Sequence, residues 1–165
     1  MAERLKGKQI AILATHGFEQ SELTEPKRLL EAEGARVSVV SPAKEATIKG
    51  WKEKNWGDAV AVDIPLDEAD PASFDALVLP DGEAAVAALA RDGHTMEFIK
   101  DQYRHGKAIL VLPASATLLK AAGVSATLPS GEADPGVVSG GDVETFIAAI
   151  ARHRHPERET DPPQV

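Results

Sequence analysis

Short apolar runs recur along the chain and alternate with amphipathic stretches. Each run is mainly apolar and is bounded by turn-forming residues, which is the pattern of strands buried on both faces of a parallel sheet. The spacing predicts four such strands: Gln9–Ala14, Ala35–Val40, Phe74–Leu79 and Ala108–Leu112. A weaker apolar stretch near residues 136–138 predicts a further short strand.

Helical periodicity fills most of the intervals between these strands. The first helix is expected to end at Glu33, because Gly34 offers a C-cap, and Pro26 within it predicts a kink or a late start. The remaining predicted helices are Glu83–Ala90, Thr95–Arg104, Ala116–Ala122 and Val143–His153. Strands that alternate with helices in this way are typical of a mostly parallel sheet sandwiched by helices.

One stretch departs from the α/β pattern. Thr47–Lys52 and Ala59–Ile64 alternate in polarity, and Asn55-Trp56-Gly57-Asp58 lies between them, which predicts a β-hairpin excursion from the sheet. We interpret residues 1–155 as a single domain. The polar residues 156–165 are expected to form a disordered tail.

The composition of the chain argues against several classes of partner and chemistry. The chain has 165 residues and a net charge of −8, which argues against partners such as nucleic acid or an anionic membrane surface. It contains no cysteine, so disulfides, thiolate metal sites and thiol catalysis are excluded. The apolar run near the N-terminus is too short for a signal peptide, and no run approaches the length of a membrane span. We expect a cytoplasmic protein without a cofactor.

The turn Pro113-Ala114-Ser115 joins a predicted strand to a predicted helix, which is where α/β hydrolases place a nucleophile. Ser115 is the only hydroxyl at this turn. It is interpreted as the N-cap of the following helix, and the alternative is a nucleophile with Glu19 or His16 as its base.

Four segments together resemble the ThiJ/PfpI superfamily, which includes DJ-1-like proteins. They are AILATHGFEQSEL, the hairpin IKGWKEKNWGDAVAVDI, SFDALVLPDG and RHGKAILVLPASATLLKAAGV, and they cover about residues 8–124 in order. The resemblance implies a flavodoxin-like α/β fold, similar to that of class I glutamine amidotransferases. It also implies self-association, because such proteins commonly form dimers or hexamers.

The resemblance further implies an active site that this chain has lost. Enzymes of the superfamily carry a Cys-His-Gly turn, and these three residues fall on Pro113, Ala114 and Ser115. Proline fixes φ near −65° and cannot adopt the strained turn of such a nucleophile. The glutamate that poises the cysteine falls on Glu19, with Glu22 as second choice.

The oxyanion-hole loop of these enzymes, Leu-Pro-Gly-Gly, falls on Leu79-Pro80-Asp81-Gly82. Asp81 replaces a glycine there, and its carboxylate would repel the negative charge that the hole should stabilise. The vestigial site therefore lacks the cysteine chemistry of the family's enzymes. Its members are Glu19, Asp81, Gly82, Pro113, Ala114 and Ser115.

Toward its C-terminus the chain is similar to the extra C-terminal domain of large-subunit catalases. The stretch PGVVSGGDVETFIAAIARHRHPERE carries this likeness, and those domains share the flavodoxin-like fold and generally lack the cysteine. The chain contains none of the haem-binding core of a catalase, so it is not a catalase by itself. Whether it is free-standing or part of a larger protein stays open.

Two further groups of residues are candidates for binding. His16, Glu19 and Glu22 follow the first predicted strand, where α/β sheets bind ligands, and they form a candidate pocket. Ile48, Trp51 and Trp56 form an apolar group on the hairpin and are candidates for an interface. The pair of histidines near residue 154 lacks metal-ligand spacing, so no metal site is predicted.

The leading hypothesis is a non-catalytic, stress-related ThiJ/PfpI-like domain that acts through self-association, as a dimer or higher oligomer, or through partner or chaperone-like binding. The alternative is a PfpI-class hydrolase, a peptidase, amidase or deglycase-like enzyme, that uses Ser115 or a water activated by Glu19. A second alternative is a small-molecule binding module at the vestigial pocket.

Overall fold

A computed structural model places most of the chain. It describes residues 5–16, 18–42, 47–52, 55–70, 73–79, 82–104, 107–112, 115–124, 137–139 and 143–151. The predicted tail, residues 156–165, lies outside these ranges.

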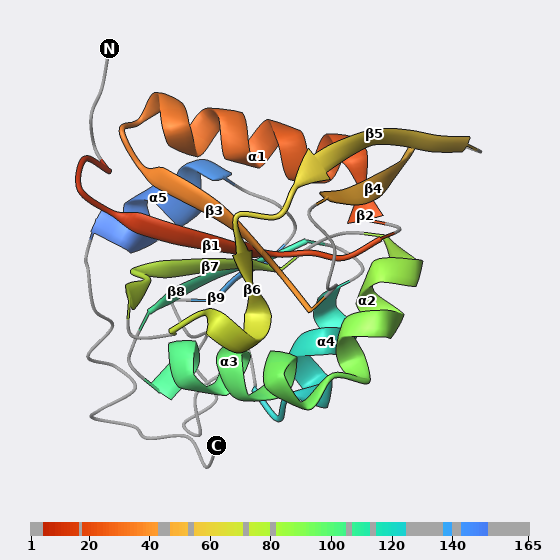
Figure 1. The fold of residues 1–165 in the computed structure, drawn as a ribbon. Helices are drawn as coiled ribbons and strands as arrows, with labels where there is room; N and C mark the ends of the chain where they lie inside the picture. Colours follow the sequence, from red (N-terminus) through yellow and green to blue (C-terminus); the bar gives the residue numbers. More distant parts are fainter. Residues whose placement is uncertain are drawn as a thin grey trace.

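A six-stranded sheet forms the centre of the molecule, with the strand order β6-β3-β1-β7-β8-β9 (Figure 1). Every neighbouring pair in it runs parallel. This confirms the predicted flavodoxin-like α/β class. Its strands are β1 (Gln9–Leu13), β3 (Arg36–Ser41), β6 (Ile64–Pro65), β7 (Ala76–Leu79), β8 (Ala108–Val111) and β9 (Val137–Ser139).

Helices cover both faces of this sheet (Figure 1). Helices α1 (Gln20–Ala32) and α5 (Val143–Ala151) lie on one face, and α1 continues through Pro26. The other face is covered by α2 (Glu83–Ala90), α3 (Gly93–Arg104) and α4 (Ala116–Ala121), with the short 3-10 turn η1 (Leu66–Glu68) beside α3.

The buried strands divide the core into two layers. In β1, Ile10 and Ile12 pack into the layer under α1 and α5, whereas Ala11 and Leu13 pack into the layer with α2, α3 and α4. Successive strand residues point to opposite faces, so a strand that is apolar at every position can fill both layers. The continuous apolar runs in the sequence therefore predicted these strands correctly.

The hairpin belongs to a second, three-stranded sheet with the order β2-β4-β5. Strand β4 (Thr47–Lys52) has the predicted bounds, but β5 spans Asn55–Ala61 instead of the predicted Ala59–Ile64. Ile64 instead begins β6, which pairs with β3 of the large sheet. The two-residue strand β2 (Phe18–Glu19), which pairs with β4, was not predicted.

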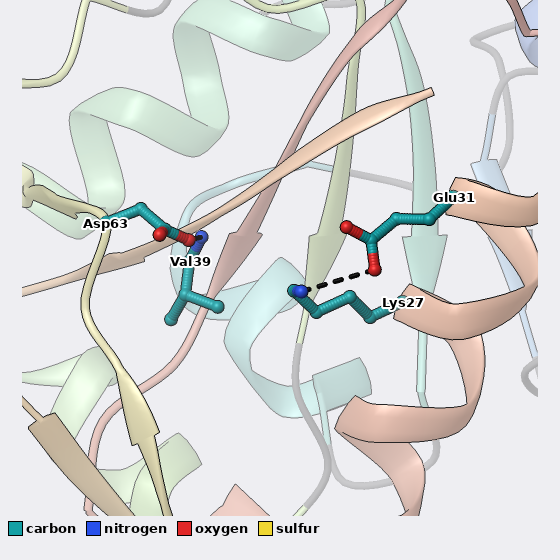
Figure 2. A network of polar contacts seen from close by, with 4 residues as sticks. All are labelled: Lys27, Glu31, Val39 and Asp63. Carbon is teal, nitrogen blue, oxygen red and sulfur yellow. Dashed lines mark hydrogen bonds and ion pairs between the residues drawn. The ribbon is translucent and has the colours of Figure 1, made fainter. Parts of the chain in front are cut away.

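Two aspartates make the same pair of backbone hydrogen bonds at the amino ends of strands. Asp75, just before β7, accepts the Gln9 amide hydrogen at 2.8 Å and donates its own to the Gln9 carbonyl at 2.7 Å. Asp63, just before β6, makes the same two bonds with Val39, at 2.7 and 2.9 Å. Figure 2 shows Asp63 beside Val39. These carboxylates hold neighbouring strands in register.

The segment before β1 also joins the core. Leu5 is fully buried, and its amide hydrogen bonds to the Glu33 carbonyl at 2.9 Å. Gly34 follows with φ +94°, and a Cβ atom there would lie 3.2 Å from the Lys6 Cα. Glycine is therefore required both by the left-handed turn and by the close approach of the N-terminal segment.

Candidate functional site

The candidate site lies at the carboxyl ends of β1, β7 and β8, which are neighbours in the large sheet. The structure places His16 after β1, Gly82 after β7 and Ser115 after β8. Helix α2 contacts both β2 and α4, so the chain segments that carry Glu19, Gly82 and Ser115 converge. Asp81, Pro113 and Ala114 lie outside the described residues.

Ser115 is fully buried. It occupies the N-cap position of α4 with φ −81° and ψ −2°, and its amide hydrogen bonds to the Leu112 carbonyl at 2.9 Å. Its side chain makes no cap hydrogen bond, so the expectation that the hydroxyl caps the helix is wrong, although the position is right. The ordinary helical backbone at Ser115 also differs from the strained turn that exposes a nucleophile.

Gly82, which falls in the position of the family's oxyanion-hole loop, has a backbone conformation that favours glycine. Its φ is +100°, which L side chains rarely adopt, and it forms the N-cap position of α2. The Val86 amide hydrogen bonds to the Gly82 carbonyl at 3.0 Å, which closes the first turn of the helix. The backbone shape of the loop at residue 82 thus still depends on glycine.

His16 connects the carboxyl end of β1 to the hairpin. Its Nδ1 accepts the Lys49 amide hydrogen at 3.1 Å. A ring nitrogen that accepts a hydrogen bond carries no proton, so this contact assigns the ring proton to Nε2. The half-buried His16 is therefore a structural link to β4 as well as a pocket candidate. No local sequence pattern indicates this link between His16 and Lys49.

The two candidate acids lie on different secondary-structure elements. Glu19 ends β2 and pairs in parallel with Trp51 of β4, whereas Glu22 lies in the first turn of α1. The side chains of both lie outside the described part of the structure, so their role as pocket acids stays a prediction. The pairing of Glu19 with Trp51 nevertheless joins the family's acid position to the hairpin.

The interface candidates separate into two kinds. Ile48 is fully buried in the layer under α1 and α5, so it belongs to the core of this chain and its assignment to an interface is corrected. A side chain without exposed surface has no area left to offer a partner. Trp51 and Trp56 stand directly opposite each other in β4 and β5, and their side chains lie outside the described residues.

Helix α1 carries ion pairs between its own side chains. Lys27 and Glu31 form an ion pair at 3.2 Å, shown in Figure 2. Arg28 pairs with Glu25, and this hydrogen bond holds the pKa of the Glu25 carboxyl below its usual range and raises the pKa of Arg28. Both groups are exposed, so solvent screens the pair and it adds little to stability.

Among the residues that the structure describes, no three histidine, cysteine, aspartate or glutamate side chains are grouped so as to hold a metal ion. Within the same ranges, no helix combines the length and apolar character needed to cross a membrane.

The chain is similar to curated proteins that include catalases and deglycases. The chain is 29% identical over 174 residues to Catalase HPII of Mycobacterium avium, which covers 96% of the chain but only 24% of the catalase. It is 36% identical over 118 residues to Protein/nucleic acid deglycase 2 of Escherichia coli strain K12, covering 71% of the chain and 66% of the deglycase. The chain thus spans about a quarter of the first relative and about two thirds of the second.

A solved structure shares the fold. It is a two-domain protein from Anabaena variabilis with DJ-1/ThiJ/PfpI-like and ferritin-like domains. The match has a TM-score of 0.65 and 22% identity, and it covers 88% of the chain and 47% of that protein. The model of the DJ-1/PfpI family matches residues 8–128, which include β1 to β8 and α4. The chain therefore belongs to the DJ-1/PfpI family.

Proposed function

We propose that this chain is a non-catalytic, stress-related DJ-1/PfpI domain that acts by association, either with a second copy of itself or with a partner protein. The observation that carries the proposal is the complete burial of Ser115, the only hydroxyl at the turn where the family places its nucleophile. A nucleophile must reach its substrate, and a fully enclosed hydroxyl does not.

The sequence supports the same conclusion independently. The nucleophile position is Pro113, and the whole chain lacks cysteine. Loss of the nucleophile removes the covalent step, while Gly82 and the fold around it persist. Similarity to a catalase over nearly the entire chain supports a stress-related setting, in which the domain accompanies other chemistry.

The hairpin is the surface that we assign to association. Its base is held firmly, because Ile48 lies in the core and its cross-strand partner Val60 packs against the same layer. Its outer part carries Trp51 and Trp56, and tryptophan is enriched where proteins bind one another. A hairpin that is anchored in the core and carries two tryptophans in its outer part suits a binding surface.

The 36% identity to a deglycase favours a second candidate, a hydrolase or deglycase that uses Ser115 or a water activated by Glu19. A turnover assay separates the two. The purified chain is compared with its Ser115→Ala and Glu19→Gln variants on peptidase, amidase and deglycase substrates, with a cysteine-containing family enzyme as positive control. We expect no turnover above background from any of the three. Turnover by the wild type that either variant abolishes would overturn the proposal.

Association is tested by solution mass. Wild-type chain, Trp51→Ala and Trp56→Ala are measured by sedimentation over a range of concentrations. We expect the wild type to self-associate and both variants to shift toward monomer. An oligomer that both variants preserve would remove the hairpin as the interface, and a wild-type monomer would remove self-association.

A further inference from the structure

A histidine side chain continues the pairing between β2 and β4. These two strands pair in parallel over only two positions, of which Phe18↔Gly50 is the first. One position earlier in β4, the Lys49 amide donates its hydrogen to His16 Nδ1 at 3.1 Å. The imidazole does for Lys49 what a backbone carbonyl does elsewhere in a sheet, and it ties the chain after β1 to the hairpin.

Both ends of this hydrogen bond are held by the core. Before His16, the buried Ala14 donates its amide hydrogen to the Val40 carbonyl at 3.0 Å. In β4, Ile48 precedes Lys49 and is fully buried. The hydrogen bond joins residues 33 positions apart in the sequence, so tertiary packing brings them together. The ring therefore bridges two segments that are each fixed independently of it.

The hydrogen bond requires an uncharged ring. A neutral imidazole offers one nitrogen as an acceptor, whereas both nitrogens of an imidazolium carry hydrogen and neither accepts. Protonation of His16 would turn Nδ1 into a donor that faces the Lys49 N–H. Two donors repel each other, so this bond would be lost. Histidine is the side chain whose charge ordinarily changes between pH 5 and 8, so a modest fall in pH suffices.

Charged residues lie on β4 and on the elements that contact β2 or β4. They are Lys49 and Lys52 of β4, Glu19 of β2, Asp58 of β5, Glu83 of α2, and Glu22 together with the ion pairs of α1. Such neighbours affect the pH at which a ring gains its proton. They do not affect the consequence, because an imidazolium lacks an acceptor at whatever pH it forms.

We propose that His16 is a pH-sensitive clasp, which holds the hairpin to the carboxyl end of β1 while its ring is neutral and releases Lys49 when the ring is protonated. The ring is half-buried, so protons reach it from solvent. The inference concerns the fold and does not depend on the proposed association. Where the hairpin associates, acid weakens the association, because the surface loses one of its ties to the large sheet.

The protonation state of the ring is tested first. Long-range 1H–15N NMR spectra show which nitrogen of a histidine carries hydrogen, and comparison with His16→Asn identifies the signals of His16. At pH 8 we expect hydrogen on Nε2 and a bare Nδ1. Hydrogen on Nδ1 at this pH would overturn the proposal, because the ring could not accept the Lys49 amide.

Amide exchange of Lys49 measures the clasp itself. Exchange of Lys49 and of the β8 amides is followed by NMR at pH 8 and pH 5 at constant ionic strength, and each rate is divided by that of an unstructured chain. We expect the protection of Lys49 to fall about 2- to 10-fold at pH 5 relative to β8, as the loss of one hydrogen bond implies. Protection of Lys49 that does not fall relative to β8 would overturn the proposal.

The variant His16→Asn isolates the proton. Asparagine carries its side-chain oxygen as many bonds from the backbone as Nδ1, and this oxygen accepts a hydrogen bond without titrating. Lys49 protection in this variant should not change with pH relative to β8. His94→Asn removes an exposed histidine of α3 and should behave like the wild type. A fall in His16→Asn equal to that of the wild type would contradict the clasp.

These measurements report on one hydrogen bond within the chain. The turnover assay measures catalysis, and sedimentation measures association. Failure of the clasp therefore remains distinguishable from failure of the proposed function.

Discussion

The two sheets of this molecule are built on different patterns. The six-stranded sheet is parallel and buried on both faces, and its carboxyl ends carry the position at which enzymes of the family place their nucleophile. The three-stranded sheet contains an antiparallel hairpin whose Ile48 face joins the core and whose Lys49 face is exposed. The larger sheet provides the scaffold, and the smaller one offers residues to the outside.

The two sheets are joined where the chain leaves β1. The chain that leaves β1 passes through His16 and Glu19, and both are bound to β4, at Lys49 and Trp51. The family's acid position is thereby part of the small sheet.

The largest effect is expected where the small sheet enters the core. Ile48→Ala removes a fully buried side chain and should lower the free energy of unfolding by about 2–5 kcal/mol. Thr47→Ala alters the exposed neighbour and is the matched control, expected within about 0.5 kcal/mol of wild type. Denaturant unfolding followed by circular dichroism measures both. Similar stability of the two variants would show that the hairpin does not pack as described.

The next largest loss in the free energy of unfolding is expected in the large sheet. Asp75→Ala removes the acceptor of the Gln9 amide hydrogen and should lower the free energy of unfolding by about 1–3 kcal/mol. Asp75→Asn keeps an oxygen acceptor at the same place and should recover most of the loss. Thermal and denaturant unfolding of the pair test this. If alanine is tolerated as well as asparagine, the carboxylate does not hold the strands in register.

A smaller effect is expected at the junction of the sheets. His16→Ala removes the acceptor of the Lys49 amide hydrogen and should lower the free energy of unfolding by about 0.5–1.5 kcal/mol. The local consequence is faster hydrogen exchange in β4. His94→Ala, at an exposed histidine of α3, is the control. Exchange in β4 that is equal in the two variants would argue against the His16 link.

The smallest effect on the free energy of unfolding is expected from the exposed Glu25–Arg28 pair on α1. The hydrogen bond from Arg28 holds the pKa of Glu25 below its ordinary value of 4.5. A carboxyl whose folded pKa is lowered contributes stability above its unfolded pKa and loses it as pH falls through the folded pKa. Stability curves of wild type and Glu25→Gln should therefore differ slightly at neutral pH and converge in acid. Divergence in acid would contradict the assigned direction.

The sequence predicted the large sheet well and the small sheet poorly. Buried parallel strands such as β1 and β8 are continuous apolar runs, and this signal is local. The bounds of β5, the bulge before Trp56 and the strand β2 depend on pairing between distant segments, which no local pattern encodes. Ile48 was misassigned for the same reason, because an alternating strand does not reveal which of its faces meets the core. Leu5 likewise joins the core through a contact with the distant Glu33.

Resemblance placed the family's nucleophile on Pro113, which lies outside the described residues, so this assignment stays a prediction. The neighbouring Ser115 is the N-cap residue of α4, as the sequence predicted by position. That its hydroxyl would be enclosed and would not cap the helix follows from packing around the turn, which a sequence of small residues does not specify. The hydrogen bond from the Lys49 amide to His16 likewise depends on packing between distant segments, which the local sequence does not specify.

The measurement that tests the central claim most directly is labelling of Ser115. The purified chain and its Ser115→Ala variant are treated with a serine-directed fluorophosphonate probe, and the modified peptides are identified by mass spectrometry. A fully buried hydroxyl should remain unmodified, so the two proteins should give the same peptides. Stoichiometric labelling at Ser115 of the wild type would contradict the account, because it would show an accessible and activated nucleophile.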